Sequence, residues 1–480
     1  MVKWKKQSKW FVLVLCFVML LSLAACGGSK EETKDPDAAA TPVAEEPVAE
    51  APKSDVKLTM WHWKVAFDPG FKAVAEAFKA KTGITVETQV VTPDEAYRQK
   101  LTAAAAAGNL PDLYAYWASP LEGAYDGIAM EWSEELNKDA DWKNGFFPAA
   151  LSGVTVAQGN IDAWNKEEAA SDWKKGRKVG EMFGIPIDVG AFYTIYGNAK
   201  LLKESGLPTT APASIEDWID NMNTVKAKTN VPGFVFTAKT FSVYENWLAN
   251  FVDYMKNGPE SYTNFMNREE KMSDPEHIHF AKFLEDLAKS GNILPGSVTL
   301  DIDPADQAFA AGKATYLIGG TFTYSSLVAM GMNPDDIMSF RAPAYKGSKV
   351  PDAKVAPFPL VQMIVNSKGK SSKEAIEFVK FLTSDEGMVL YANEAFDIPS
   401  RNIADKSQLR DAINSMISSL SSESNWWSEN SAISNKVFGP EWQLFHESKQ
   451  RMILGEMTAQ QVAEKFDKDA AAEKAKEEKK

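Results

Sequence analysis

The segment VKLTMWHWKVAFDPGFKAVAEAFKAKTGITVETQV, residues 56–90, decides the fold. Its first six residues alternate apolar and polar side chains, which predicts a β-strand. From Phe71 to Phe78 the apolar residues recur at helical spacing, and Gly83 predicts the end of that helix. Residues 84–90 alternate again. A strand, a helix and a second strand of these lengths predict an α/β sheet with helices on its faces.

The same kinds of pattern continue along the chain. They predict a helix over 94–107, a strand over 112–117, strand segments at 184–188, 191–196, 315–320 and 361–366, a largely helical stretch over 214–310, a helix over 372–383, and a charged, frayed helix over 467–480. The sequence shows no internal repeat. We therefore expect one architecture built from alternating strands and helices.

The N-terminus predicts export. Residues 1–10 contain four lysines and no acid, an apolar run extends to Leu21, and Leu-Ala-Ala-Cys follows at 23–26. This order is typical of a secretory signal peptide, here residues 1–25, and the apolar run is too short to span a membrane comfortably. The tetrapeptide, followed by Gly27, resembles a bacterial lipobox, which implies that Cys26 carries a lipid. The alternative is an ordinary signal peptide in which the cysteine is incidental.

Residues 26–54 follow as the lipidated cysteine and a tether. Four prolines and seven acids, without an aromatic, Leu or Ile side chain, predict a disordered segment. With two acyl chains on Cys26, the mature protein would stay on the extracytoplasmic face of the bacterial cell membrane. Cys16 leaves with the signal peptide, so no free thiol remains for catalysis.

The charge of the chain excludes one class of partner. The sequence has 52 basic and 65 acidic residues and a net charge of −13, and loss of the four N-terminal lysines takes it to −17. Nucleic acids need a basic surface, so we expect no nucleic-acid partner.

Several motifs stand in the order of one protein family. After Leu58-Thr59-Met60-Trp61 they are FKAKTGITV at 78–86, AGNLPD at 107–112, FGIP at 183–186, YGNAKLL at 196–202, FAAGKA at 309–314, GGTF at 319–322, AIEFVKFLTS at 375–384, IPSR at 398–401 and GEMT at 455–458. Each motif alone is weak. Their order, with the lipobox and the tether, resembles the family 1 extracellular solute-binding proteins of ABC importers, the maltose-binding-protein-like group, over about 55–470.

This resemblance implies a periplasmic-binding-protein-like fold (type II) of two α/β lobes with a hinge and an inter-lobe ligand cleft. We expect the first lobe at 55–190 plus 358–395, the second at 191–357 plus 396–470, and a charged tail at 471–480. It also implies a monomer without a cofactor. This monomer is expected to close on a carbohydrate, an oligosaccharide in this group, and to deliver it to the membrane subunits of an ABC permease.

Aromatic residues at strand ends suggest what the cleft binds. Sugar rings present apolar faces that pack on aromatic planes, and their hydroxyls need a few polar partners. Trp61-His62-Trp63 ends the first strand, and its three rings cannot all face one side. From this pattern and the resemblance, the expected ligand-binding residues are Trp63, His62, Trp117, Asp188, Tyr193, Tyr244, Trp247, Thr321, Phe322 and Trp442.

Several of these residues have a structural alternative. Asp188 lies at the first crossing between lobes, where a hinge hydrogen bond is equally compatible with its position. Tyr244 and Trp247, three apart on a helix, could form a core face instead. The remaining alternatives are Asp68 beside His62, Trp426 or Trp427 in place of Trp442, and a structural role for Arg401.

The sequence offers little for a metal or a catalytic centre. His277 and His279 are two apart in an apparently helical stretch, which predicts different faces. Asp301 begins like a calcium loop, but Gly312 occupies the twelfth position. We therefore expect no metal and no enzyme. The alternatives are a glycoside hydrolase, which would need two facing carboxylates, and a binder of a non-sugar polar solute.

Overall fold

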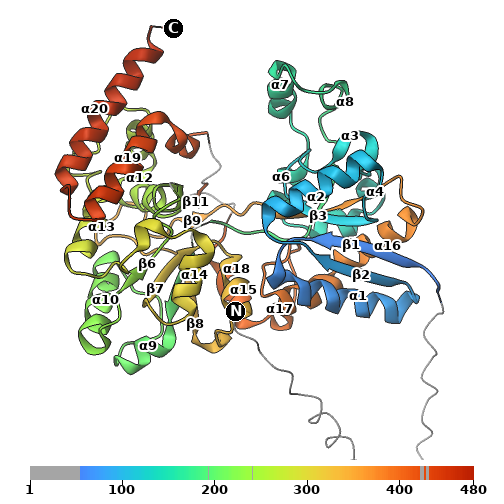
Figure 1. Ribbon diagram of the computed structural model, residues 1–480, viewed down its shortest axis with the longest axis horizontal. Coiled ribbons are helices and arrows are strands. Elements are labelled where there is room, and N and C mark those ends of the chain that lie inside the picture. The colour runs from blue at the N-terminus through green and yellow to red at the C-terminus, as the bar shows by residue number, and fades with distance from the viewer. Residues whose placement is uncertain (1–53, 193, 241, 422–425, 429–431, 480) are drawn as a thin grey trace, which may run out of the picture. The chain divides into compact units, whose positions relative to one another are not determined.

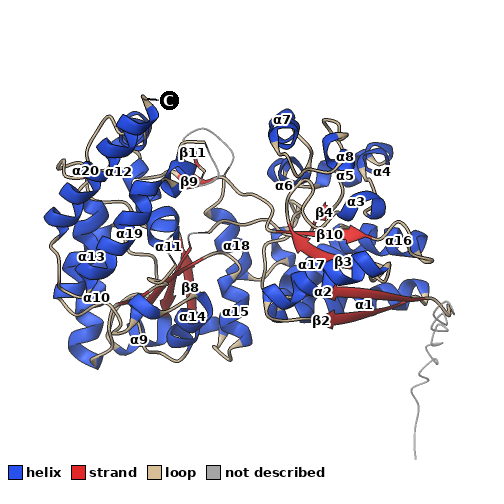
Figure 2. Ribbon diagram, turned by 45° about the horizontal axis from the view of Figure 1, so that its top comes forward, coloured by secondary structure: helices blue, strands red, loops and turns tan. Residues whose placement is uncertain are grey.

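The computed structural model describes residues 54–192, 194–240, 242–421, 426–428 and 432–479. The signal peptide, Cys26, nearly all of the tether and Tyr193 lie outside the described residues. Within them, two separate β-sheets are each covered by helices, which confirms the predicted α/β class (Figure 2). No helix in this part of the chain is both long and apolar enough to cross a membrane.

The first sheet has five strands in the order β2-β1-β3-β10-β4. They are β1 (Lys57–His62), β2 (Thr85–Val90), β3 (Leu113–Trp117), β4 (Ile185–Pro186) and β10 (Val361–Val365). Strand β1 pairs in parallel with β2 and β3, whereas β10 runs antiparallel between β3 and β4. All five residues of β10 are buried, as expected for a strand with helices on both faces.

The helices of this sheet include the one predicted from residues 71–78. Figure 1 shows them around the strands: α1 (Asp68–Thr82), α2 (Asp94–Ala107), α16 (Ser372–Leu382), α17 (Asp385–Ala395) and the short α3 (Tyr125–Ile128), α4 (Ser133–Lys138), α6 (Pro148–Val154), α7 (Gln158–Lys166) and α8 (Asp172–Lys175). The same group includes the short helix α5 (Ala140–Gly145) and the 3₁₀ turn η1 (Val65–Phe67). Gly83 and Gly108 end α1 and α2 in the left-handed conformation, as the sequence predicts. We call this sheet and its helices the first half.

The second sheet has four strands in the order β6-β7-β5-β8. They are β5 (Thr194–Asn198), β6 (Phe234–Val235), β7 (Tyr316–Gly319) and β8 (Ile337–Phe340). Its longer helices are α10 (Ile215–Thr229), α12 (Asn250–Met266), α13 (His279–Lys289), α14 (Ile302–Ala310), α19 (Pro440–Ile453) and α20 (Ala459–Glu477). We call this sheet and its helices the second half.

Shorter elements complete the second half. They are α9 (Ala199–Glu204), α11 (Ser242–Tyr244), α15 (Thr323–Ala329), α18 (Asp411–Ser418), the 3₁₀ turns η3 (Ser297–Thr299), η4 (Pro334–Asp336), η5 (Lys406–Gln408) and η6 (Ser434–Phe438), the π-helical turn η2 (Glu245–Ala249), and the paired β9 (Lys354–Val355) and β11 (Trp426–Trp427). The stretch 214–310 is mostly helical as predicted, but it also contains the short strand β6.

A buried ion pair fixes the π-helical turn η2. Both Glu245 and Lys449 of α19 are fully buried, and the Lys449 ammonium lies 2.5 Å from the Glu245 carboxylate. His446 lies near the same carboxylate oxygen, at 3.4 Å. Because Trp247 belongs to this turn, the ion pair also sets the position of the Trp247 ring.

Breaking this pair should cost far more stability than removing both charges. We expect Lys449→Met to lower the free energy of unfolding by about 3–5 kcal/mol, because it leaves the Glu245 charge buried and unpaired. The double variant Glu245→Gln/Lys449→Met should recover most of that loss in denaturant unfolding. Lys282→Met, which removes an exposed partner of Asp286, is the control and should stay within about 0.5 kcal/mol. Equal losses for the single and double variants would contradict the assignment.

Candidate functional site

Two of the predicted aromatic residues, Trp63 and Trp117, come together at the ends of β1 and β3. Their rings stack with centroids 4.0 Å apart, and the Arg98 guanidinium of α2 lies 3.6 Å from the Trp117 ring centroid. Tyr97 packs near Trp63 at 5.5 Å. The Trp117 ring is therefore stacked between Trp63 and Arg98. The sequence predicted that Trp117 contacts a sugar, but both faces of its ring are covered.

His62 supports the chain rather than facing outward. Its side chain is buried, its Nε2 lies 3.2 Å from Asp68 Oδ1, and its ring packs on Phe71. Burial lowers the pKa of His62, although Asp68 opposes that effect. Asp68 also accepts hydrogen bonds from Thr88 and pairs with Lys72. We correct the prediction for His62: it joins β1 to the start of α1.

A second aromatic cluster lies in the second half. Phe192 stacks on Trp247 with centroids 5.2 Å apart, and both rings make edge contacts with Phe322, at 6.0 and 6.4 Å. Phe358 packs edge-on against Phe192 at 5.1 Å. The structure thus brings together the predicted residues Trp247 and Phe322 and adds Phe192 and Phe358, which the sequence reasoning missed.

Lys64 reaches this cluster from the first half. It follows β1 directly, and its ammonium lies 4.7 Å from the Phe322 ring centroid and 5.7 Å from that of Phe67. Burial lowers the pKa of Lys64, and Asp306 and Asp303 of α14 are the strongest opposing charges. The contact between Lys64 and Phe322 joins the loop after β1 to the turn after β7.

Asp306 is the acidic counterpart of Lys64. It is only 2 % exposed, and it forms no hydrogen bond or ion pair with any described residue. Burial raises the pKa of Asp306 to about 8; the Asp303 carboxylate adds to this increase, and the Lys64 ammonium opposes it.

Three chain segments cross between the two sheets, and Asp188 links all three. Its Oδ1 accepts hydrogen bonds from the backbone amides of Leu360, at 3.0 Å, and Val361, at 2.7 Å. An isolated β-bridge pairs Asp188 with Pro399. The Asp188 side chain is fully buried. The structure thus gives this residue the structural role that the sequence left open, and we withdraw the expectation that it contacts ligand directly.

The second oxygen of Asp188 meets another carboxyl group. Asp188 Oδ2 and Asp397 Oδ1 are both buried without a donor among the described residues. A single proton shared between the two carboxyl groups would satisfy both oxygens. Burial and the like charge of the neighbour raise the pKa of Asp188, and burial raises that of Asp397 to about 6. Tyr391 donates a hydrogen bond to the other oxygen of Asp397.

The crossing also requires a glycine. A Cβ on Gly190 would lie 2.1 Å from Thr321 Oγ1 and 2.7 Å from a Leu360 methyl carbon, so only glycine fits. Thr321 is buried and accepts a hydrogen bond from the Ala191 amide at 3.4 Å. The predicted polar residue Thr321 therefore holds the crossing to β7, which corrects its proposed contact with ligand.

Two other predicted residues are core residues. Trp442 is packed among Phe265, Phe280, Phe445 and Phe466 in the α13–α19–α20 layer. Both Trp442 and Tyr244 are only 2 % exposed. These burials correct the predicted ligand roles.

Tyr244 and Trp247 both belong to the buried core of the second half, and Trp247 is 8 % exposed. The core alternative that the sequence left open fits both rings, and the π-helical turn η2 begins directly after Tyr244. Arg401 is structural, because its guanidinium binds the Asp385 carboxylate and the Trp142 carbonyl oxygen.

The paired histidines differ from the prediction. His277 precedes α13 rather than lying within it, and His279 begins that helix. Both imidazoles therefore reach one oxygen of the buried Asp253, at 2.9 and 2.8 Å. His277 also contacts Glu270 at 2.6 Å, which ties the loop between α12 and α13 together.

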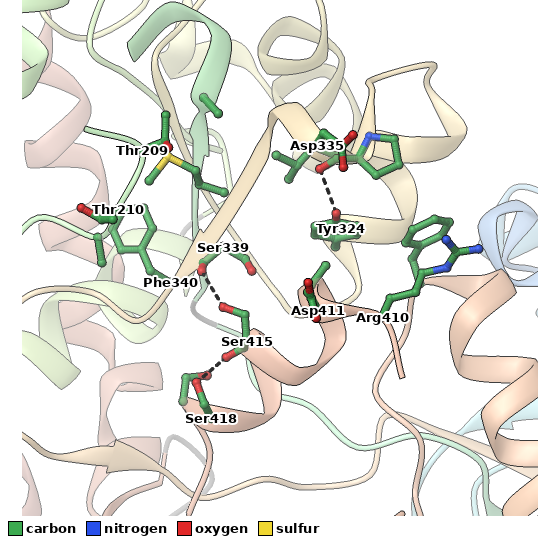
Figure 3. A pocket seen from close by; sticks show the side chains of 18 of the residues that line it. Thr209, Thr210, Tyr324, Asp335, Ser339, Phe340, Arg410, Asp411, Ser415 and Ser418 are labelled. Atoms are coloured by element: carbon green, nitrogen blue, oxygen red, sulfur yellow. Dashed lines mark hydrogen bonds between the residues drawn. The ribbon is translucent and has the colours of Figure 1, made fainter. Parts of the chain in front are cut away.

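A pocket of about 990 Å³ lies away from these residues. Figure 3 shows it between β8 and α18, and no predicted ligand residue lines it. Its polar groups already have partners within the protein. The Ser415 hydroxyl donates a hydrogen bond to the Ser339 carbonyl oxygen, and the Tyr324 hydroxyl donates one to the Pro334 carbonyl oxygen. The Arg410 guanidinium lies over the Phe396 ring. We interpret it as an open groove between an edge strand and its covering helix.

One signal for Lys64 is present in the sequence. This lysine directly follows the aromatic run Trp61-His62-Trp63, so it lies beside the rings from which a binding site was predicted. Asp306 and Asp397 carried no signal, because their partners lie far away in the sequence.

A proton shared by Asp188 and Asp397 would make the stability of the crossing depend on pH. The folded pair would keep a proton that the unfolded chain releases above about pH 4, so the free energy of unfolding should fall as pH rises through 6 and beyond. Asp188→Asn keeps the oxygen that accepts both amides and supplies an N–H to Asp397. We expect the stability of this variant, relative to wild type, to increase between pH 5 and pH 8 in denaturant unfolding.

The control for that experiment is Asp220→Asn, an exposed substitution on α10. Its effect should be equal at the two pH values. A relative stability of Asp188→Asn that does not change with pH would rule out the shared proton.

The fold was compared with known proteins. A search of curated proteins finds no match. A protein of Caldanaerobius polysaccharolyticus, from a study of xylan utilization, aligns with a TM-score of 0.60 and 19 % identity over 86 % of this chain and 100 % of its own. A chitin oligosaccharide binding protein aligns with a TM-score of 0.58 and 21 % identity, over 87 % of this chain and 98 % of its own. Maltose-bound MalE3 of T. maritima aligns with a TM-score of 0.60 and 17 % identity, over 87 % of this chain and 99 % of its own. At these identities the likeness concerns the fold.

A family model supplies the assignment. The model described as bacterial extracellular solute-binding protein matches residues 65–389, more than half of the chain. This match confirms the resemblance found in the sequence motifs, and with the two-sheet architecture it establishes the two-lobed periplasmic-binding-type fold. The protein belongs to the bacterial extracellular solute-binding protein family.

Proposed function

We propose that this protein is the receptor of an ABC importer, which captures a carbohydrate between its two halves and delivers it to the permease. The observation that carries the proposal is the cluster of Phe192, Trp247 and Phe322, which Lys64 joins from the other half. Aromatic faces beside a polar group are what a sugar ring requires. Family membership itself implies a location outside the cytoplasm.

The chain path supports a closing motion. We propose lobes at 55–190 plus 358–395 and at 191–357 plus 396–470, with the segments around Asp188, Phe358 and Pro399 as the hinge. Few-residue crossings of this kind absorb the backbone rotation when lobes close on a ligand. The named ligands of two proteins with this fold, chitin oligosaccharide and maltose, support a sugar.

The ligand can be found by thermal-shift screening of the mature protein against an oligosaccharide library. A ligand that binds only the native state raises the melting temperature. For the best saccharide, Phe322→Ala should weaken binding about tenfold in calorimetry, because the sugar loses its aromatic surface.

Phe438→Ala removes an exposed ring of the second half and serves as the matched control. Its affinity should equal that of wild type. The sugar assignment is wrong if no saccharide shifts the melting temperature while another class of solute does.

A glycoside hydrolase is the second candidate, and one observation favours it. Burial raises the pKa of Asp306 to about 8, the direction that an acid catalyst requires, and Asp303 lies one helical turn away. Both belong to the same helix, whereas hydrolysis needs carboxylates on the two sides of the bond. Release of reducing ends from the bound oligosaccharide, abolished in Asp306→Asn, would establish the enzyme instead of the receptor.

We also propose that Cys26 anchors the protein through lipid. Two acyl chains suffice for durable attachment. Cys26→Ala should leave ligand binding unchanged and move the protein from the membrane fraction to the medium, as fractionation and labelling with a radioactive fatty acid would show. Membrane retention of the unlabelled variant would contradict the anchor.

A further inference from the structure

A buried histidine of the second half has a carboxylate at each of its ring nitrogens. His277 Nδ1 lies 2.9 Å from Asp253 Oδ1 of α12, and His277 Nε2 lies 2.6 Å from Glu270 Oε2 in the loop 267–278. The side chains of His277 and Asp253 are fully buried, and that of Glu270 is partly buried. The imidazole also stacks on the Phe265 ring of α12, with centroids 4.4 Å apart. His277 therefore joins α12 to this loop by two polar contacts within the core.

The two contacts fix the protonation state of His277. A neutral imidazole has one N–H and one lone pair, whereas an imidazolium donates from both nitrogens. A neutral ring would therefore turn a lone pair toward one of the carboxylates at hydrogen-bond distance. Asp253 Oδ2 is buried without a donor among the described residues, so this carboxylate depends on the donors at its Oδ1. The geometry thus requires the doubly protonated ring, which binds both carboxylates by charge-assisted hydrogen bonds.

The direction of the pKa shifts agrees with this geometry. Burial lowers the pKa of His277, but Asp253 and Glu270 outweigh burial, and the net shift is upward. Burial also opposes the ionisation of the two carboxyl groups, yet their hydrogen bonds, with His277 foremost, lower the pKa of both. The folded protein therefore keeps one cation between two anions.

Other titratable side chains face this network from α12, α13 and the segment between β8 and β9. His279 of α13 has its Nε2 2.8 Å from Asp253 Oδ1, and a neutral ring with one N–H satisfies that contact. Burial lowers the pKa of His279. Lys256 of α12 donates to a backbone carbonyl oxygen of the loop, and Tyr345 packs edge-on against His279. Of the two histidines, only His277 needs two ring protons for its contacts.

The loop 267–278 also binds the two C-terminal helices. Two of its backbone amides lie 2.7 and 3.2 Å from the Asp467 carboxylate of α20. The Arg268 guanidinium binds Glu441 of α19 at 2.7 Å and Glu477 of α20 at 2.8 Å. A change in the position of this loop therefore reaches α19 and α20.

We propose that His277 is a pH-sensitive latch on this layer of helices. As an imidazolium it joins α12 to the loop 267–278, and once it loses a proton, the loop and its contacts with α19 and α20 loosen. A group whose pKa is raised by folding contributes stability that is complete below its unfolded pKa, about 6.5 for histidine, and that is lost as the pH rises through the folded pKa. Members of this family lie outside the cytoplasm, so the latch meets the pH of the surroundings. The latch does not depend on which solute the protein binds.

The first test is a titration of the imidazoles of the mature protein by NMR. The chain has four histidines, so nitrogen-15 labelling of histidine gives few signals, and substituting the other three with Gln one at a time assigns those of His277. We expect the midpoint of His277 to lie above about 6.5, the value of an unperturbed histidine, and that of His279 to lie below it. A His277 midpoint at or below about 6.5 would overturn the latch.

The second test measures hydrogen exchange of the mature protein at pH 6 and pH 9, after correction for the intrinsic exchange rates. In wild type, peptides from the loop 267–278 and from α20 should lose at least about tenfold in protection at the higher pH, the factor that one unit of pKa shift represents. Glu270→Gln should lose less than about threefold, because its amide can donate to a neutral ring and His277 no longer needs two protons.

The matched control is Glu269→Gln, which removes the neighbouring, exposed carboxylate of the same loop. It should show the full loss of protection seen in wild type. Equal losses in wild type and Glu270→Gln would overturn the latch, even with a raised midpoint of His277. The titration is made on the wild-type contacts of His277, so it gives an answer even where Glu270→Gln folds poorly.

Discussion

The fully buried carboxyl pair of Asp188 and Asp397 is the constraint on which the arrangement of the two halves depends. One oxygen of Asp188 holds the amides that begin β10, and its carboxyl group interacts electrostatically with that of Asp397 at the third crossing. Charge of this kind is costly to bury, so both partners must keep their positions. The interaction ties together three segments that are widely separated in the sequence, and it does so where the chain leaves each sheet.

The aromatic cluster is a direct continuation of this crossing. Phe192 follows Asp188 by a few residues, and Phe358 lies opposite Gly190 in an isolated β-bridge. Both rings are therefore placed by the same backbone contacts that hold the crossing. The ion pair of Glu245 and Lys449 places Trp247 from the other side. The candidate site thus depends on two buried charge interactions, and its own rings need little further support.

The sequence predicted the elements better than the site, for physical reasons. Strand and helix periods are local, so β1, α1 and β2 could be located from residues 56–90. Which side of a strand end a ring faces depends on packing, and Trp117 is covered by Arg98 from the neighbouring α2. The π-helical turn η2 that follows Tyr244 has no local sequence signal. Asp188 had two compatible roles, and only its distant partner Asp397 decides between them.

The place of β10 in the chain has a consequence for folding during synthesis. This strand completes the middle of the first sheet, between β3 and β4, but its residues follow all four strands of the second sheet. Until it emerges, the N-terminal part lacks a strand and leaves an edge of β3 unpaired. Pairings between such distant segments form slowly, because a long loop must close first. Because β10 is made late, the first sheet stays incomplete until most of the chain has been synthesised.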